Sequence, residues 1–144
     1  MAESILFVGK SRFLNLTERR KIRSVLTKKA KEFKFVISWL QYVFVSDEDL
    51  LQMNQSVLDH DTYTDIITFD LSDKEGIIEG EIYISIDRVR DNAEQYNASF
   101  EEEYIRVLGH GLLHLLGFKD KTETDSSEMR KQENKLIDLY KNTN

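Results

Sequence analysis

Two histidines set one helical turn apart are the residues of this sequence best suited to chemistry. His110 and His114 are four positions apart, so an α-helix would place both imidazoles on one face. The opposite face would carry an apolar stripe formed by Ile105, Leu108, Leu112 and Leu116. Buried imidazoles need polar partners, and a pair at this spacing can hold one metal ion at about 2.0–2.1 Å. A metal site is therefore the first hypothesis.

A glycine and an aspartate after the second histidine complete a ligand set. Gly117 permits a tight turn that would bring Asp120 back toward the two imidazoles. The pattern H-x-x-x-H-x-x-G-x-x-D has the spacing of the metzincin zinc site, with Asp in the third place. Three protein ligands leave one position for water, which is typical of catalytic zinc. We therefore predict a zinc-dependent hydrolase with one Zn²⁺ per chain, held by His110, His114 and Asp120.

Alternatives to this ligand set stay open on the sequence alone. A histidine pair at helical spacing often has only a structural role, although the glycine turn and the nearby carboxylate favour a metal here. A carboxylate ligand makes the ion less electrophilic than a third histidine would, so a harder ion such as Mn²⁺ is conceivable. His60, the remaining histidine, is a candidate ligand in place of Asp120.

The residue after the first histidine argues against one class of zinc enzyme. Zinc peptidases of the H-E-x-x-H type carry their general base at that position, and this chain has Gly111 there. Glycine has no side chain with which to activate water. Peptide hydrolysis by that mechanism is therefore disfavoured.

The composition is that of one ordinary globular domain. The chain has 144 residues, of which 40% are hydrophobic and 32% charged, and it contains no cysteine. The absence of cysteine excludes a disulfide scaffold, thiol catalysis and a cysteine-ligated metal. Neither a signal peptide nor a run of about 18 apolar residues is recognisable. We expect a cytoplasmic protein without a membrane partner, organised as a single domain over residues 1–144.

Basic residues gather near the N-terminus of an acidic chain. The formal net charge is −6, yet residues 1–36 contain ten basic and three acidic residues. Such a stripe can hold phosphates locally, because charges are screened beyond about 8–10 Å at ordinary salt. A solvated helix face explains the same pattern and is the more common case.

Capping and patterning signals predict the elements that must position the histidines. Helices are expected at 15–32, 46–54, 85–96, 99–116 and 126–141, and the first and fourth open on capping boxes, Asn15 with Glu18 and Ser99 with Glu102. Strands are expected at 5–8, 35–45, 63–69 and 80–84, where apolar, β-branched and aromatic residues gather. Strands and helices do not alternate strictly. We therefore predict an α+β domain with one mixed sheet of about four strands and about five helices.

Several ordered blocks make the sequence resemble the YbeY family of bacterial endoribonucleases, also called rRNA maturation factors. The family pattern H-G-x-L-H-L-x-G-[YF]-D-H is similar to HGLLHLLGFKD at residues 110–120. Family members also carry an Asn followed ten and eleven residues later by Thr-Asp, which corresponds to Asn54, Thr64 and Asp65. Their Gly-[DE]-Ile strand corresponds to residues 80–85. The resemblance covers about residues 40–120.

The resemblance implies a zincin-like fold with a zinc-binding helix, and placement in the cytoplasm. It implies a single-strand-specific, metal-dependent endoribonuclease that acts in rRNA maturation, at the ends of 16S rRNA, and in ribosome quality control. The expected partners are ribosomal RNA and the ribosome or its proteins, and not DNA. Asn54 and Asp65 would orient the substrate or a group behind the metal ligands, although Asp65 is equally suited to capping its strand.

Two departures from the family pattern bear on this expectation. Asp120 stands where the family has its third histidine, and Lys119 precedes it where Asp is usual. Leu58 stands where the family has an arginine thought to hold substrate phosphate, and leucine cannot pair with phosphate. Arg106 and the basic residues of the first helix are the candidate replacements, and Arg106 is equally suited to a salt bridge.

Three classes of function therefore remain on the sequence. The first is hydrolysis of an RNA phosphodiester, in which the metal would activate water or polarise a phosphoryl oxygen and the RNA 2′-hydroxyl offers a nucleophile. The second is a non-catalytic, ribosome-associated factor that binds RNA or protein and has a structural metal site, which Leu58 favours. The third is a metallopeptidase, which Gly111 disfavours.

Overall fold

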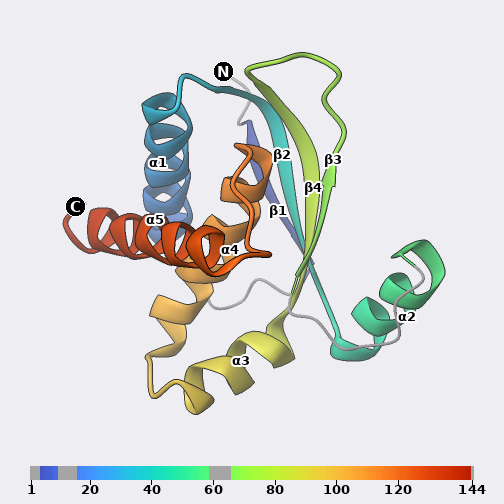
Figure 1. Cartoon of the computed structure of the whole chain (residues 1–144). Helices are drawn as coiled ribbons and strands as arrows, with labels where there is room; N and C mark the ends of the chain where they lie inside the picture. The colour runs from blue at the N-terminus through green and yellow to red at the C-terminus, as the bar shows by residue number, and fades with distance from the viewer. Residues whose placement is uncertain (1–3, 10–15, 59–65, 144) are drawn as a thin grey trace.

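The computed structural model describes residues 4–9, 16–58 and 66–143, which form four strands and five helices (Figure 1). The strands are β1 (Ile5–Gly9), β2 (Val36–Val45), β3 (Ile66–Asp70) and β4 (Ile77–Ser85). The helices are α1 (Leu16–Glu32), α2 (Asp47–Leu58), α3 (Ile86–Gln95), α4 (Phe100–Leu115) and α5 (Glu123–Lys141). The predicted α+β class is confirmed. Within these ranges, no helix has both the length and the apolar character that crossing a membrane requires.

The sheet is mixed, and its antiparallel edge lies beside the histidine helix. The strand order is β1-β2-β4-β3. β2 pairs parallel with both β1 and β4, and β3 pairs antiparallel with β4. The backbone of α4 at Gly111 lies against Ile82 of β4 and Ile66 of β3. The second half of α4 therefore packs under this edge of the sheet.

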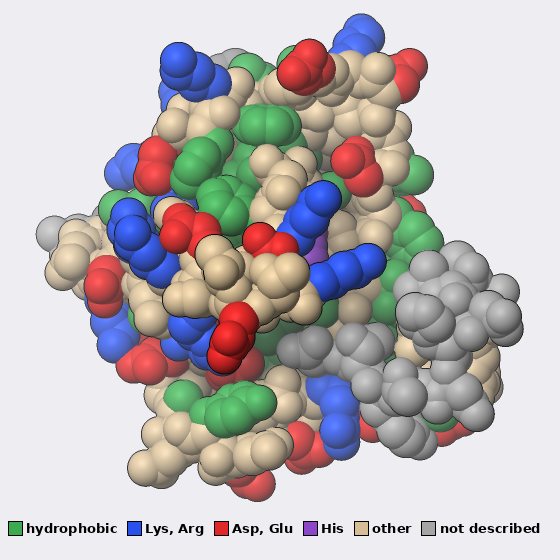
Figure 2. All heavy atoms as spheres, viewed as in Figure 1, with side chains coloured by type: hydrophobic (Ala, Val, Ile, Leu, Met, Phe, Trp, Pro, Cys, Tyr) green, Lys and Arg blue, Asp and Glu red, His purple; other side chains and the backbone are tan. Residues whose placement is uncertain are grey.

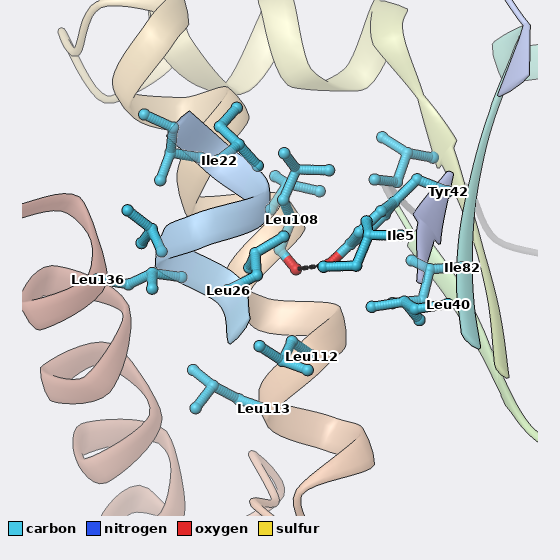
Figure 3. Packing of buried hydrophobic residues seen from close by; sticks show 14 of the residues in the cluster. Ile5, Ile22, Leu26, Leu40, Tyr42, Ile82, Leu108, Leu112, Leu113 and Leu136 are labelled. Atoms are coloured by element: carbon cyan, nitrogen blue, oxygen red, sulfur yellow. Dashed lines mark hydrogen bonds between the residues drawn. The ribbon is translucent and has the colours of Figure 1, made fainter. Parts of the chain in front are cut away.

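One hydrophobic core joins the sheet to the helices that cover it. α1, α4 and α5 lie on one side of the sheet and α2 lies on the other (Figure 1). Side chains from the centre of the sheet meet side chains of α1, α4 and α5 (Figure 3), among them Leu40, Tyr42, Ile82, Leu26, Leu108, Leu112 and Leu136. The buried hydroxyl of Tyr42 donates to the carbonyl oxygen of Leu108 at 2.8 Å, a bond with a net value of about 0.5–1.5 kcal/mol. The sheet thus holds α4 just before its first histidine.

The start of α4 is set by a cap that the sequence predicted. The hydroxyl of Ser99 accepts from the backbone N–H of Glu102 at 3.1 Å. Glu101, Glu102 and Glu103 all lie in the first turn, where carboxylates interact favourably with the positive end of the helix dipole. These features fix the register of the helix, and with it the face on which the histidines lie.

Several predicted boundaries differ from the observed ones. α2 continues to Leu58 instead of ending near Asn54, because no glycine or proline interrupts it. β4 begins at Ile77 instead of Gly80, since pairing with β2 starts there. α5 begins at Glu123 instead of Ser126, because the Thr122 hydroxyl accepts from the N–H of Asp125 at 3.0 Å and caps the helix. Residues 63–65 of the predicted third strand, and the cap predicted at Asn15, lie outside the described residues.

Candidate metal centre

His110 and His114 project from the C-terminal half of α4 with their rings edge to face. Their Nε2 atoms lie 3.0 Å apart. On the far side of each ring, Nδ1 of His110 lies 2.6 Å from Oε2 of Glu133, and Nδ1 of His114 lies 3.2 Å from the carbonyl oxygen of Phe118. An ionised carboxylate and a carbonyl can only accept, so both Nδ1 atoms carry the proton. The two Nε2 lone pairs therefore face each other.

The turn after α4 brings Asp120 to the same point. Gly117 has a φ of 103° and donates from its N–H to the carbonyl oxygen of His114 at 3.0 Å, the left-handed conformation that ends many helices. Oδ2 of Asp120 then lies 3.4 Å from Nε2 of His110 and 3.6 Å from Nε2 of His114. The structure thus brings together the three residues that the spacing selected.

The three facing atoms have the arrangement of a metal-ligand set. They outline a triangle with sides of 3.0, 3.4 and 3.6 Å. In a tetrahedral zinc site with bonds of about 2.0–2.1 Å, neighbouring ligand atoms are about 3.3–3.4 Å apart. Within the part of the chain that the structure describes, His110, His114 and Asp120 form the one group of such side chains able to hold a metal ion. Two unprotonated nitrogens and a carboxylate oxygen fit a divalent cation.

The electrostatics of the site favour the neutral form of His114. Burial lowers the pKa of His114 below its usual value of 6.5, and the neighbouring His110 lowers it further. Asp120, the Phe118 carbonyl and Glu133 act in the opposite direction without reversing the shift. Neutral imidazole is the form that binds a metal. The ring of His114 is therefore prepared to act as a ligand.

Gly111 faces the sheet, and the structure shows why a side chain is absent there. A Cβ atom at this position would lie 2.7 Å from Cδ1 of Ile82 and 3.0 Å from Cδ1 of Ile66. Ile82 is fully buried, so little free space surrounds it. H-E-x-x-H peptidases carry their general base at this position. Here the packing of α4 against β3 and β4 takes up the space that such a side chain would need.

Two cavities border the ligand set, one at His110 and Asp120 and the other at His114. The first, of about 300 Å³, is lined by His110 and Asp120 together with polar residues of α3, α4 and α5, among them Asn92, Arg106, Arg130 and Glu133. The second, of about 340 Å³, is lined by His114 and by residues 66–68 and 70 of β3. Figure 2 shows the exposed histidine surface with Lys or Arg side chains beside it. Space for a ligand therefore adjoins both histidines.

The predicted catalytic residues Arg106 and Asn54 do not share one environment in the structure. The guanidinium of Arg106 lies 3.2 Å from Glu133 and 3.6 Å from Glu103, so the salt-bridge alternative describes its observed contacts. Asn54 is buried on α2, at 3% exposure, and is not one of the three grouped ligands. Asp65 and His60 lie outside the described residues.

Part of the basic stripe of α1 is engaged inside the fold. Lys29 is only 2% exposed, and its ammonium group donates to Gln132 at 2.7 Å. The Nε of Arg23 donates to the carbonyl oxygen of Ile5 at 2.8 Å, and the Lys21 ammonium lies 4.1 Å from the ring centre of Tyr140. The stripe is therefore not a continuous free surface for phosphates.

The sequence reasoning missed Glu133, whose carboxylate contacts His110. Glu133 lies on the inner face of α5, where its neighbours in the stripe are Met129, Leu136 and Tyr140. It is only 4% exposed. A charged residue inside an apolar stripe is the signal that could have identified it, because such a group needs a buried partner.

Sequence comparisons with known proteins identify relatives of this chain. A family model described as "Endoribonuclease YbeY" matches residues 10–141. A protein of Cytophaga hutchinsonii named "Endoribonuclease YbeY" is 50% identical over 139 residues, which are 96% of this chain and 97% of that protein. Proteins of the same name from Flavobacterium psychrophilum and Bacteroides thetaiotaomicron are 48% and 44% identical over 70% and 68% of this chain, and these matches cover 71% of each relative.

A solved structure has the same fold. The solution structure of TM1509 from Thermotoga maritima superposes with a TM-score of 0.67 at 28% sequence identity, covering 94% of this chain and 88% of that one. The family model covers far more than half of the chain, and the relative from Cytophaga hutchinsonii spans nearly its whole length. The chain belongs to the endoribonuclease YbeY family.

Proposed function

We propose that this protein is a zinc-dependent endoribonuclease. The observation that carries the proposal is the convergence of Nε2 of His110, Nε2 of His114 and Oδ2 of Asp120 on one point. Family membership supplies the substrate class, because the relatives are named endoribonucleases. Two nitrogens with one carboxylate suit zinc, and the exposed position of Asp120 leaves the ion open to water and substrate.

The residues of the site divide into ligands and groups that orient them. His110, His114 and Asp120 would hold the ion, which when bound would lower the pKa of its water or polarise a phosphoryl oxygen. Each histidine is fixed by the acceptor behind it, Glu133 or the Phe118 carbonyl. Asp65 is proposed to orient the substrate, and Asn54, which is buried on α2, is proposed to orient a supporting group and not the substrate itself. The RNA supplies a 2′-hydroxyl as an internal nucleophile, so the chemistry does not need a side chain at Gly111.

Cations beside the ligand set would replace the arginine that the family pattern places at Leu58. Lys119 and Lys121 are exposed and flank Asp120 in the chain. Arg130 is also exposed and lines the cavity that contains His110 and Asp120. Arg106 lines the same cavity, and we propose that its remaining donors help hold phosphate. Phosphate contacts of this kind supply affinity that does not depend on the base sequence.

The cellular role follows from the family and not from the site. We propose that residues 1–144 form one domain that acts in the cytoplasm on single-stranded ribosomal RNA, in the maturation of 16S rRNA ends and in ribosome quality control. The ribosome or its proteins are the proposed partners. The two cavities, one beside His110 and Asp120 and one beside His114, support an extended, unpaired substrate, because they give the strand space beyond the metal position.

A non-catalytic RNA- or protein-binding factor is the second candidate. Leu58 favours it, since the family pattern has a phosphate-binding arginine at that place. In this case the metal would stabilise the turn between α4 and α5 without reacting. The two candidates differ in one measurable property, which is turnover of RNA.

The test is cleavage of a labelled single-stranded RNA by the purified protein, before and after removal of metal with a chelator. We expect cleavage that disappears on chelation and returns on addition of Zn²⁺, with little cleavage of the same sequence in a duplex. A casein assay run in parallel should stay negative. Tight RNA binding without turnover in the zinc-loaded protein would favour the second candidate.

A further inference from the structure

We propose that Glu133 is a positioning residue for the metal site, whose carboxylate fixes the ring and the tautomer of His110 and by its charge strengthens His110 as a metal ligand, and that Arg106 holds this carboxylate in place. The inference rests on the proposed function, because it concerns the same site, and it assigns a role to two residues outside the ligand set.

The contact between Glu133 and His110 is short and shielded from water. Oε2 of Glu133 lies 2.6 Å from Nδ1 of His110, across the interface between α5 and α4. The Glu133 side chain is 6% exposed and that of His110 is 22% exposed. A carboxylate at this distance accepts a hydrogen bond from Nδ1–H, so the proton stays on Nδ1. Nε2 is then unprotonated and directed at His114 and Asp120.

The other oxygen of Glu133 is held by arginine. Nη1 of Arg106 donates to Oε1 at 3.2 Å, and Nε of Arg130 lies 4.0 Å from the same oxygen. A buried carboxylate is costly without a counter-charge, and Arg106 at 18% exposure supplies one. Because the arginines contact Oε1, Oε2 remains available to the imidazole. The order of contacts is thus Arg106, Glu133, His110, metal position.

The two histidines are supported unequally, and the difference indicates a role beyond helix packing. His114 donates to a neutral carbonyl oxygen in the turn that follows its own helix. His110 instead donates to a carboxylate that α5 carries on its buried face, between the apolar side chains of Met129, Leu136 and Tyr140 and beside the buried Gln132. Packing alone would be served better by an apolar residue there. A carboxylate behind a histidine raises its strength as a metal ligand, and losing such a partner typically lowers metal affinity about 10–100-fold.

The test measures zinc affinity and the tautomer of His110 in the full chain, without an RNA assay. Metal-free wild-type protein, Glu133→Ala and Glu133→Gln are titrated with Zn²⁺ against a chromophoric chelator. Imidazole ¹⁵N–¹H spectra of the metal-free proteins report which ring nitrogen of His110 carries the proton. Glu128→Gln is the matched control, because it removes a carboxylate from the same helix, where it contacts Gln132.

We expect zinc affinity to fall in the order wild type, Glu133→Gln, Glu133→Ala, with a loss of about 10–100-fold for the alanine variant. The glutamine side-chain oxygen can still accept a hydrogen bond from Nδ1–H of His110, so the tautomer should persist in Glu133→Gln. In Glu133→Ala the tautomer should become mixed. Glu128→Gln should retain wild-type affinity. If Glu133→Ala does not fold, the comparison of Glu133→Gln with wild type decides the question.

Equal zinc affinity in wild type and Glu133→Gln would overturn the proposal, as would an equal loss in Glu128→Gln. An unchanged His110 tautomer in a folded Glu133→Ala would overturn it as well. These readouts are independent of the reaction. Absence of RNA cleavage by a wild-type protein that shows the expected affinities would count against the proposed function alone.

Discussion

Replacing His114 with alanine is expected to lower kcat/KM for RNA cleavage by at least about 100-fold and to weaken zinc binding strongly. His114 supplies one of three ligand atoms, and its Nε2 lies 3.0 Å from Nε2 of His110. Alanine leaves one imidazole and one carboxylate facing the metal position, which is too few for a stable protein site. The measurement is the initial rate of cleavage of a labelled single-stranded RNA, with metal content determined on the same samples.

The control for this variant separates loss of the site from loss of the fold. Asp138→Ala removes an exposed carboxylate near the far end of α5 and should retain wild-type rates. Because the His114 ring is partly exposed, its removal should leave the helical circular dichroism signal unchanged. Undiminished cleavage by a folded His114→Ala protein that lacks zinc would contradict the proposed mechanism.

The substitution Gly111→Glu is expected to lower the free energy of unfolding by at least about 3 kcal/mol and to confer no peptidase activity. The substitution restores the H-E-x-x-H sequence, yet the new side chain would start 2.7 Å from Cδ1 of Ile82. Its side chain would enter the apolar contact that α4 makes with Ile82 and Ile66 of the sheet. A native domain is stable by only about 5–15 kcal/mol, so a large part of the protein should unfold on mild heating.

Gly111→Ala is the matched control for this prediction. Alanine adds only a methyl group, which meets the Cδ1 atoms of the same two isoleucines and Cγ2 of Ile82, and it gains about 1 kcal/mol of helix propensity. We expect its free energy of unfolding to stay much closer to that of the wild type, as measured by urea denaturation. A Gly111→Glu protein with wild-type stability and activity on casein would show that our description of this helix face is wrong.

The metal helix was predictable because its signals are local. Ser99 caps the helix, Gly117 ends it, and the four-residue spacing of His110 and His114 fixes their common face. The same turn chemistry predicted the return of Asp120. For these residues, backbone geometry over about one helical turn decides the arrangement, and tertiary contacts only support it.

The parts of the site that the sequence did not predict depend on packing between distant elements. Glu133 lies 23 positions after His110 and contacts it from the next helix, and no local pattern predicts that α5 crosses α4 at this point. Arg106 was a candidate for phosphate binding, but its observed contacts are carboxylates supplied in part by α5. Lys29 was counted in the basic stripe, although the contact between α1 and α5 buries it against Gln132.

The starts of β4 and α5 were also predicted wrongly from the sequence, because contacts outside each element help to set them. β4 extends to Ile77 because β2 offers a partner from Val36 onward, and pairing of this kind is invisible in one strand's own composition. The early start of α5 depends on the Thr122 hydroxyl, a cap that competes in the sequence with several nearby serines and threonines. Local propensity selects the element, and long-range contacts set its length.

The most direct measurement is the metal content of the purified wild-type protein, prepared without chelator and compared with His114→Ala and Asp120→Ala. We predict about one zinc per chain in the wild type and a large loss in both variants, because three facing ligand atoms are needed to hold the ion. A wild-type protein that contains no metal and takes up none when zinc is added would contradict the account.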